Sequence, residues 1–432
     1  MAKRGAHVSK ATSTQQQHQQ IESSAATFSH IPKAPPDPIL SLTERYRNDP
    51  SDLKVNLGVG AYRTDNGSPL VLRCVKRAEQ AIFDEQEGGS VTKEYAPIEG
   101  LPPFNQKACE LVFGKNCLAL DQDRVASVQA LSGTGALRVA FSFLYENVNP
   151  PAVYIPTPSW GNHAKIVPAS GLNVVHYPHF DQSSRMLEED GLLKSLSDAP
   201  AGSIVLLHAC AHNPTGVDPS EDQWHRILDT IQQNNLVPFF DVAYQGFATG
   251  DFDADAFPVR LFEHAGLDMI VAQSFAKNMG LYGERVGALH VVTQSEDEAT
   301  NVKSQLKQSI RPMYSSPPVH GALIADRVMS DPELKQLWEV EVNQMTGRIK
   351  RMRTMLRSEL ERLQAPGDWS HITSQIGMFS FTGLTPAQCA NMIHKWHVYM
   401  TSDGRISLAG LSDGTCPYVA EAIKDSIESC RE

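Results

Sequence analysis

The feature that most constrains the fold is an alternation of short apolar runs with helical patterns between about residues 105 and 300. Four runs read as buried strands: 153–155, 203–208, 236–241 and 268–272. Between two of them, Ser220 and Gln223 form a capping-box signature, and apolar residues follow at helical spacing: Trp224, Ile227, Leu228 and Ile231. This alternation predicts an α/β fold with a largely parallel sheet covered on both faces.

A second pattern predicts one long helix near the C-terminus. Asp331 and Pro332 supply an N-cap and a first-turn proline, and Pro366 with Gly367 ends the pattern after about Gln364. Such a helix of about 32 residues would span roughly 48 Å. Because one domain does not need that length, we expect the helix to lead into a second, smaller domain.

Composition excludes several classes of function. The chain has 432 residues with 38 Lys and Arg against 49 Asp and Glu, a net charge of −11, and no basic stripe, so nucleic acid is not expected as a partner. The longest apolar runs are strand-sized, so no membrane span is expected. Seven cysteines without metal-ligand spacing indicate reduced thiols in an intracellular protein and no metal site.

Residues 1–30 differ from the rest of the chain. Lys3, Arg4 and Lys10 precede the first acidic residue, Glu22, and Gln and Ser dominate. This composition predicts a disordered tail, or alternatively a transit segment, since transit peptides are basic, rich in Ser and poor in acid. The expected location is cytoplasmic, with plastid or mitochondrion as the alternative.

The strongest candidate for chemistry is Lys277, in the segment 274–285 just beyond an apolar run. A buried lysine has a lowered pKa, so it can form an imine and then carry a proton, and Arg285 eight positions on suggests an anion site. Taken alone, a lysine is more often a solvated surface residue. The neighbouring motifs favour the chemical interpretation.

Three further segments follow predicted strands or begin a helix. Ser132, Gly133 and Thr134 precede a helical pattern and would make a phosphate cradle, although many such sequences are ordinary N-caps. Asn213 lies in a turn-rich loop that is either structural or aimed at a ligand oxygen. Asp241 would be costly to bury unless a cation, such as a protonated pyridine nitrogen, pairs with it; the alternative is a helix N-cap.

Together these motifs resemble those of the aspartate aminotransferases, pyridoxal 5′-phosphate (PLP) enzymes of fold type I, over about residues 30 to 430. The matching segments occur in the family's order: 56–62, 158–163, 212–216, 241–246, 274–285, 311–315 and 404–407. Residues 395–400 look most like the eukaryotic, plant-type branch. The resemblance implies a division into a tail or transit segment (1–30), an N-terminal arm with part of the small domain (31–72), a large PLP-binding domain (73–340) and a small C-terminal domain (341–432).

The resemblance also implies a role for each cofactor-binding residue. Lys277 would bind PLP covalently and shuttle the proton, and Asp241 would keep the pyridine nitrogen protonated. Tyr244 and Asn213 would hydrogen-bond the ring oxygen, and Trp160 would stack on the ring, with His163 supporting Asp241. The residues implied for the phosphate are Ser132, Gly133, Thr134, Ser274, Arg285 and, from the neighbouring subunit, Tyr95.

Substrate recognition would depend on two arginines. Arg405 would bind the α-carboxylate, and Arg311, donated by the second subunit of a homodimer, the side-chain carboxylate, because planar guanidinium groups bind carboxylates in a bidentate way. Singly, each arginine would more often be a surface ion pair. Gly60 would let the backbone approach the substrate, and Trp160 and Asn213 would also contact it. Dicarboxylic amino acids and oxo acids are the implied ligands.

The implied reaction is reversible transfer of the amino group from L-aspartate to 2-oxoglutarate by a ping-pong mechanism. A broader aminotransferase for aromatic or sulfur-containing amino acids is the alternative. A catalytically silent homologue would be expected to lack Lys277, Asp241 or Arg405, and all three are present.

Two positions depart from the family's pattern. Ser316 stands where the family usually has Asn, and Ala96 replaces a larger apolar residue after Tyr95. A shorter side chain at 316 would loosen the network around the phosphate and Arg311. We therefore hypothesise reduced cofactor affinity without loss of activity.

Overall fold

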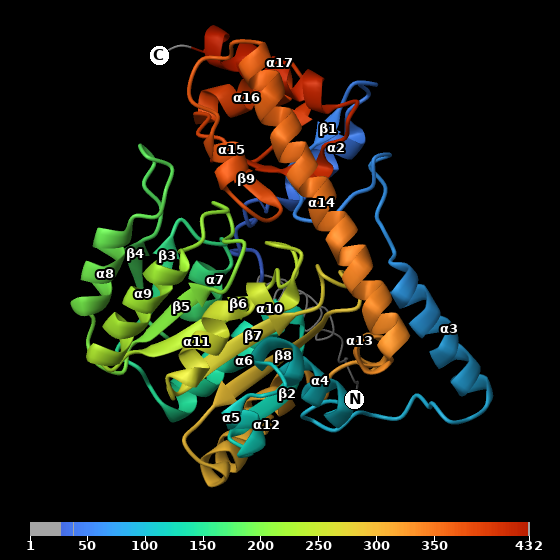
Figure 1. The fold of residues 1–432 in the computed structure, drawn as a ribbon, viewed down its shortest axis with the longest axis vertical. Helices are drawn as coiled ribbons and strands as arrows, with labels where there is room; N and C mark the ends of the chain where they lie inside the picture. Colours follow the sequence, from blue (N-terminus) through green and yellow to red (C-terminus); the bar gives the residue numbers. More distant parts are fainter. Residues whose placement is uncertain (1–26, 38, 431–432) are drawn as a thin grey trace, which may run out of the picture.

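The computed structural model describes residues 27–37 and 39–430 and centres on a seven-stranded sheet with the order β2-β8-β7-β6-β5-β3-β4 (Figure 1). The strands are β2 (Val125–Leu131), β3 (Val153–Thr157), β4 (Val174–Pro178), β5 (Ile204–His208), β6 (Val237–Val242), β7 (Met269–Ser274) and β8 (Val286–Val292). Every pairing from β4 through β7 is parallel, whereas β8 runs antiparallel to β7 and β2. The prediction of a largely parallel sheet is confirmed, and the four predicted strands are β3, β5, β6 and β7.

Helices cover both faces of this sheet, as predicted. Successive strand residues point to opposite faces, so Phe239 packs in one buried cluster and Phe240 in another. The first cluster contains side chains of α6 (Ser132–Asn147) and α12 (Glu296–Tyr314), and the second those of α9 (Glu221–Gln233) and α11 (Phe257–His264). The remaining helices around the sheet are α4 (Pro102–Phe113), α5 (Leu118–Asp121), α7 (His163–Ala169), α8 (Glu189–Ser197), α10 (Phe252–Asp255) and α13 (His320–Ser330).

Helix α9 shows both the capping box and the buried apolar stripe that its sequence predicts. The Ser220 hydroxyl accepts from the Gln223 N–H at 3.3 Å, and the Gln223 side chain accepts from the Ser220 N–H at 2.9 Å. An N-cap of this kind is worth about 1 kcal/mol. The predicted apolar stripe is buried against the sheet: Trp224, Ile227, Leu228 and Ile231.

The predicted long helix is α14 (Pro332–Arg362), 31 residues long, and the Asp331 carboxylate caps it by accepting from the Glu333 and Leu334 N–H groups. In Figure 1 it runs from the sheet to a second group of elements near the C-terminus. That group comprises α15 (His371–Ser374), β9 (Phe379–Phe381), α16 (Pro386–His394), β10 (Val398–Tyr399), β11 (Arg405–Ser407), the 3-10 helix η1 (Leu408–Gly410) and α17 (Cys416–Ser429).

Segments from the start of the chain pack onto this C-terminal group and onto α14. Strand β1 (Val55–Asn56), which follows α2 (Leu40–Asn48), pairs in parallel with β10. Helix α3 (Arg73–Glu87) has no cap from its own N-cap residue; instead the Glu341 carboxylate of α14 accepts from the Arg73 and Cys74 N–H groups at 2.8 and 3.0 Å. The division at residues 72 and 340 stays a prediction, and its second boundary would fall inside α14. Residues 1–26 of the predicted tail lie outside the described part.

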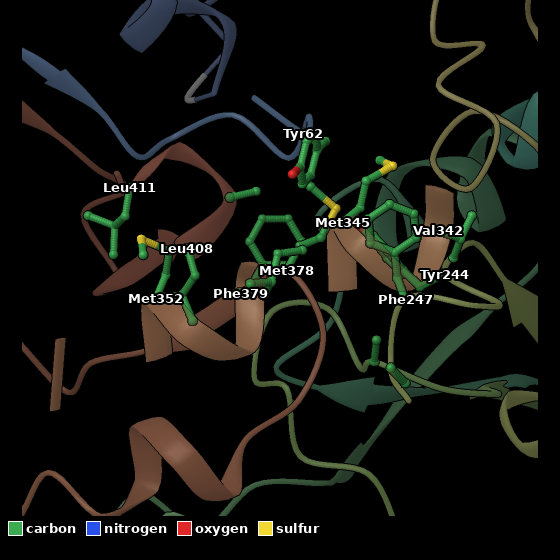
Figure 2. Packing of buried hydrophobic residues seen from close by; sticks show 14 of the residues in the cluster. Tyr62, Tyr244, Phe247, Val342, Met345, Met352, Met378, Phe379, Leu408 and Leu411 are labelled. Atoms are coloured by element: carbon green, nitrogen blue, oxygen red, sulfur yellow. The ribbon is translucent and has the colours of Figure 1, made fainter. Parts of the chain in front are cut away.

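A buried cluster joins these regions where the site lies. Figure 2 shows Val342 and Met345 of α14 beside Tyr244 and Phe247 from the loop after β6, with Phe379 on the other side. All five side chains are at most 5% exposed. The ends of the sheet and the C-terminal elements therefore share one core.

Candidate active site

The carboxyl ends of β5, β6 and β7 bring two predicted residues, Asp241 and Ser274, to the same end of the sheet as His208. The start of α6 meets them, because the Ser132 and Ser274 hydroxyls are 2.8 Å apart. A Cβ atom added to Gly133 would lie 3.5 Å from the Ser274 Cβ and 4.0 Å from Asp241 Oδ1. The free N–H groups of the first turn of α6 thus face the ends of the strands, as an anion cradle requires.

Lys277 lies just beyond β7, and its Nζ donates to the Gly60 carbonyl at 2.7 Å. The amine is 5.6 Å from the ring centre of Tyr244 and 5.4 Å from that of Tyr282. Burial of the amine, followed by the nearby charges of Arg405 and Arg285, lowers the pKa of Lys277 from 10.5 to about 8, although Asp241 acts in the opposite direction. The lowered pKa increases the neutral fraction of the amine near neutral pH, and the neutral form is the one that a nucleophilic lysine needs.

Asp241 is fixed on one side and free on the other. Its Oδ2 is 3.0 Å from His163 Nε2, and His163 Nδ1 lies 2.8 Å from the Ser159 hydroxyl. Its Oδ1 is buried and has no partner in the described part of the chain. A buried carboxylate oxygen without a donor is costly, so this oxygen suits a cationic N–H group of a ligand.

Arg405 brings a second buried charge to the same place from β11. Its guanidinium donates to the Gly58 carbonyl at 2.8 Å and to Asn213 Oδ1 at 3.4 Å, and its Nε is buried without an acceptor. Its Cζ lies 4.5 Å from the centre of the Phe379 ring. Burial lowers the pKa of Arg405. An unpaired buried guanidinium that retains free donors is suited to a carboxylate ligand.

Gly60 and several aromatic residues pack around these charged groups. A Cβ atom at Gly60 would come within 2.7 Å of Phe379 Cζ, so packing against Phe379 requires glycine here, and the approach of this backbone to a substrate stays a prediction. Burial raises the pKa of Tyr244, so its hydroxyl stays a neutral donor. The Trp160 ring meets that of His163 edge-on at 5.2 Å.

Three predicted residues are exposed on the chain. Tyr95 is 85% exposed, and its own N–H donates to the Glu94 carboxylate at 2.7 Å. Arg311 donates to the Ser315 hydroxyl, one turn along α12, at 2.6 Å. Arg285 is also exposed and donates to the Tyr282 carbonyl, but its charge reaches Lys277. Thr134 lies in the first turn of α6 and is partly buried.

Sequence reasoning missed three contributors. Tyr282 lies inside the 274–285 segment, and its hydroxyl accepts from the Tyr62 N–H at 2.9 Å. Ser159 lies inside the 158–163 segment, so motif membership was a signal for both. Phe379 carried no signal, because its contacts come from distant parts of the chain. Within residues 27–37 and 39–430, no group of three or more His, Cys, Asp or Glu side chains is placed to hold a metal.

Comparison with known proteins identifies the class. The family model described as aminotransferase class I and II matches residues 52–423. The chain belongs to this family, whose members use PLP as cofactor.

Individual relatives narrow the class. Aspartate aminotransferase 1 of Medicago sativa is 53% identical over 401 residues, which cover 93% of this chain and 95% of the relative. The aspartate aminotransferase from Saccharomyces cerevisiae cytoplasm has a TM-score of 0.91 at 43% identity, covering 94% and 100% of the two chains. An aromatic-amino-acid aminotransferase from Burkholderia pseudomallei, covalently bound to PLP, has a TM-score of 0.89 at 41% identity, covering 93% and 99%. Relatives that match nearly the whole chain at 53% and 43% identity are thus named aspartate aminotransferases.

The compartment is not fixed by these relatives. Aspartate aminotransferases that are 50–52% identical carry the words cytoplasmic, chloroplastic and mitochondrial in their names. In the described part of the chain, no helix combines the length and apolar character needed to cross a bilayer.

Proposed function

We propose that the protein is an aspartate aminotransferase that reversibly transfers the amino group of L-aspartate to 2-oxoglutarate, giving oxaloacetate and L-glutamate. The observation that carries this proposal is the proximity of one partly buried lysine to one buried carboxylate and one buried guanidinium, whose charges both act on the lysine amine. The names of the relatives supply the substrate pair.

The free groups of the site fit PLP. Asp241 Oδ1 would accept from the protonated ring nitrogen, and His163 would hold the carboxylate in place through the bond to Oδ2. Ser132, Gly133, Thr134, Ser274 and Arg285 would hold the phosphate at the start of α6, and Asn213 and Tyr244 the ring oxygen. When bound, PLP supplies a reactive carbonyl and a ring that stabilises negative charge on the substrate's Cα.

Lys277 would act twice. Its amine would hold the cofactor covalently as a nucleophile, and the free amine would carry a proton to and from the substrate's Cα. The pKa of about 8 serves both roles, because the amine must exist in neutral and protonated forms near neutral pH. The bond from Nζ to the Gly60 carbonyl gives the released amine a defined position.

Two arginines would select the substrate. Arg405, buried and already oriented by the Gly58 carbonyl and Asn213, would bind the α-carboxylate of any amino acid. Arg311 would bind the second carboxylate across the interface of a homodimer, and Tyr95 would reach the neighbour's phosphate in the same way. The exposure of both residues in one chain supports this proposal.

The substrate assignment is tested with Arg311→Ala. We expect kcat/KM for aspartate to fall about 100-fold or more, because a desolvated carboxylate loses its cation, while phenylalanine turnover changes little. Arg362→Ala, which removes an exposed arginine paired with Glu359, is the control. Equal losses for both substrates would instead favour the broad aminotransferase, an alternative supported by the structural similarity to an aromatic-amino-acid aminotransferase.

We further propose a cytoplasmic location, with plastid or mitochondrion as the alternative. Residues 1–30 contain a single arginine, Arg4, fewer than is typical of transit peptides. A fluorescent protein fused behind residues 1–30 should stay diffuse in a plant cell. Import of that fusion into an organelle would reverse the assignment.

A further inference from the structure

A second cavity lies between helix α14 and the segment that follows α15. Its volume is about 170 Å³, and Phe247 and Ala248 from the loop after β6 form part of its wall. Arg353 and Gln375 also line it and are 3% and 1% exposed, whereas Lys350 is exposed. None of the lining residues is an Asp or Glu. The cavity is therefore lined by two cations and no acid.

Arg353 carries a buried charge that the described chain does not neutralise. Its guanidinium donates to the carbonyls of Ile372 and Gly377, at 2.7 and 2.9 Å, and to that of Phe379. These bonds use three of its five N–H groups, and Nε is buried without an acceptor. Burial lowers the pKa of Arg353 to about 9, with no carboxylate acting against it among the residues described.

Gln375 adds a second free donor. Its Oε1 accepts from the Ser380 hydroxyl at 2.9 Å and from the Phe381 N–H at 3.1 Å, which fixes the orientation of the amide. Its Nε2 is buried without an acceptor. Two buried donors without acceptors thus belong to residues that line the same cavity, a setting that favours a ligand that only accepts hydrogen bonds.

We infer that this cavity binds a small oxyanion, a carboxylate or a phosphate, through Arg353 and Gln375, with Lys350 adding charge. Its volume equals that of roughly five or six water molecules, which suits such an ion. A negative ion is favoured over water alone because the buried guanidinium lacks a counter-charge. Lys277, Asp241 and Arg405 do not line the cavity, so the site is separate from the proposed catalytic one.

The two sites are nevertheless connected through one residue. Arg353 bonds the carbonyl of Phe379, and the ring of Phe379 lies against the guanidinium of Arg405. An ion bound to Arg353 would hold the segment that supports Arg405. Binding of the ion to this cavity can be measured by thermal unfolding, which does not depend on aminotransferase activity.

The test compares the PLP-loaded protein with two variants that make the same change of charge. Gln375→Glu keeps both bonds to Oε1 and replaces the free donor by a carboxylate oxygen that can serve Arg353. Gln344→Glu makes the same change on an exposed position of α14. Thermal unfolding is followed in inorganic phosphate and in acetate, each against sodium chloride at equal ionic strength.

We expect phosphate or acetate, at about ten times its dissociation constant, to raise the unfolding temperature by roughly 2 °C. The larger rise identifies whether phosphate or carboxylate is preferred. Gln344→Glu should respond in the same way, whereas Gln375→Glu should lose the response. Anion binding at Arg405 or Arg311 is common to all three proteins and cancels in this comparison.

An anion response that is equal in Gln375→Glu and the unchanged protein would overturn the inference. Crystals of the unchanged protein, soaked in whichever of phosphate and acetate gives the larger rise, provide a second measurement that does not depend on the variant. That ion within hydrogen-bonding distance of Arg353 would support the site, and water alone in the cavity would refute it.

Discussion

Two groups of predicted site residues differ in how the chain holds them. Lys277, Asp241 and Arg405 are each fixed by a hydrogen bond to a distant part of the chain. Tyr95 and Arg311 are exposed and bond residues one and four positions away. A single chain therefore holds in place the three groups proposed to act on every amino acid. Arg311, the residue proposed to select the substrate's side chain, is not held in this way and would be fixed only by the second subunit.

This difference has an energetic side. A buried group that is already oriented loses little conformational entropy when ligand arrives, so its electrostatic effect is available in full. A long exposed side chain such as Arg311 loses about 2 kcal/mol of rotamer entropy when it is fixed. In a dimer, contacts at the interface would already hold the Arg311 side chain, so this entropy would be lost before the substrate binds.

A hybrid dimer tests most directly whether Lys277 and Arg311 of one site come from different chains. Lys277→Ala should lower kcat about 10⁴-fold or more, since nucleophile and proton carrier are both lost. A dimer of one Lys277→Ala chain and one Arg311→Ala chain, purified with two tags, should regain about half of the unchanged activity, because one of its two sites is intact.

The reason is geometric: the intact site takes Lys277 from one chain and Arg311 from the other. A chain carrying both changes, paired with an unchanged chain, is the control for assembly. If the activity of the hybrid is no higher than that of the two single-variant homodimers, Arg311 acts within its own chain, and the proposed donation across the interface is wrong.

The next largest effect is expected for Asp241→Asn. The amide keeps the shape but removes the negative charge opposite the cofactor's ring nitrogen, so kcat should fall about 10²- to 10³-fold. Asp253→Asn, at an exposed carboxylate, is the matched control. Activity within threefold of the unchanged enzyme would mean that the buried carboxylate is structural only.

A smaller effect is expected on the titration of Lys277. In the cofactor-free protein, its acylation rate, followed by mass spectrometry, should rise with pH and level off above about pH 8, since only the neutral amine reacts. Arg405→Met removes a positive neighbour that favours the neutral amine, so the midpoint should rise by about half a pH unit. A midpoint near 10.5 in the unchanged protein would contradict the buried setting.

The smallest effect is expected for Ser316→Asn. Restoring the family's usual side chain should tighten PLP binding about threefold, the worth of one modest hydrogen bond. Ser304→Asn, on the exposed face of α12, controls for the substitution itself. A PLP titration that shows no tightening would count against the loosened network around the phosphate.

Short stretches of sequence were sufficient to predict the helices and strands that position the buried site residues. The capping residues of α9 and α14 and the apolar runs of β5, β6 and β7 are visible in short stretches of sequence, so Asp241 and Ser274 could be placed at strand ends. The antiparallel direction of β8 was not predicted, because direction depends on the path of the chain between strands.

Distant contacts explain what was missed. Phe379 meets Gly60 and Arg405, residues far from it in sequence, and no periodicity marks it. The unpartnered donors of Arg353 and Gln375 are equally invisible before the chain folds. The roles of Tyr95 and Arg311 came from the family resemblance alone and stay predictions.

Because β1 pairs with β10, the first strand of the chain must wait during synthesis for a partner that is made much later. Val55 leaves the ribosome long before its partner Val398, and at 5–20 residues per second the intervening stretch of about 340 residues takes tens of seconds to make. During that interval the strand lacks its native partner, β10. Chaperones that shield nascent chains should therefore be needed most at the amino-terminal end of this protein.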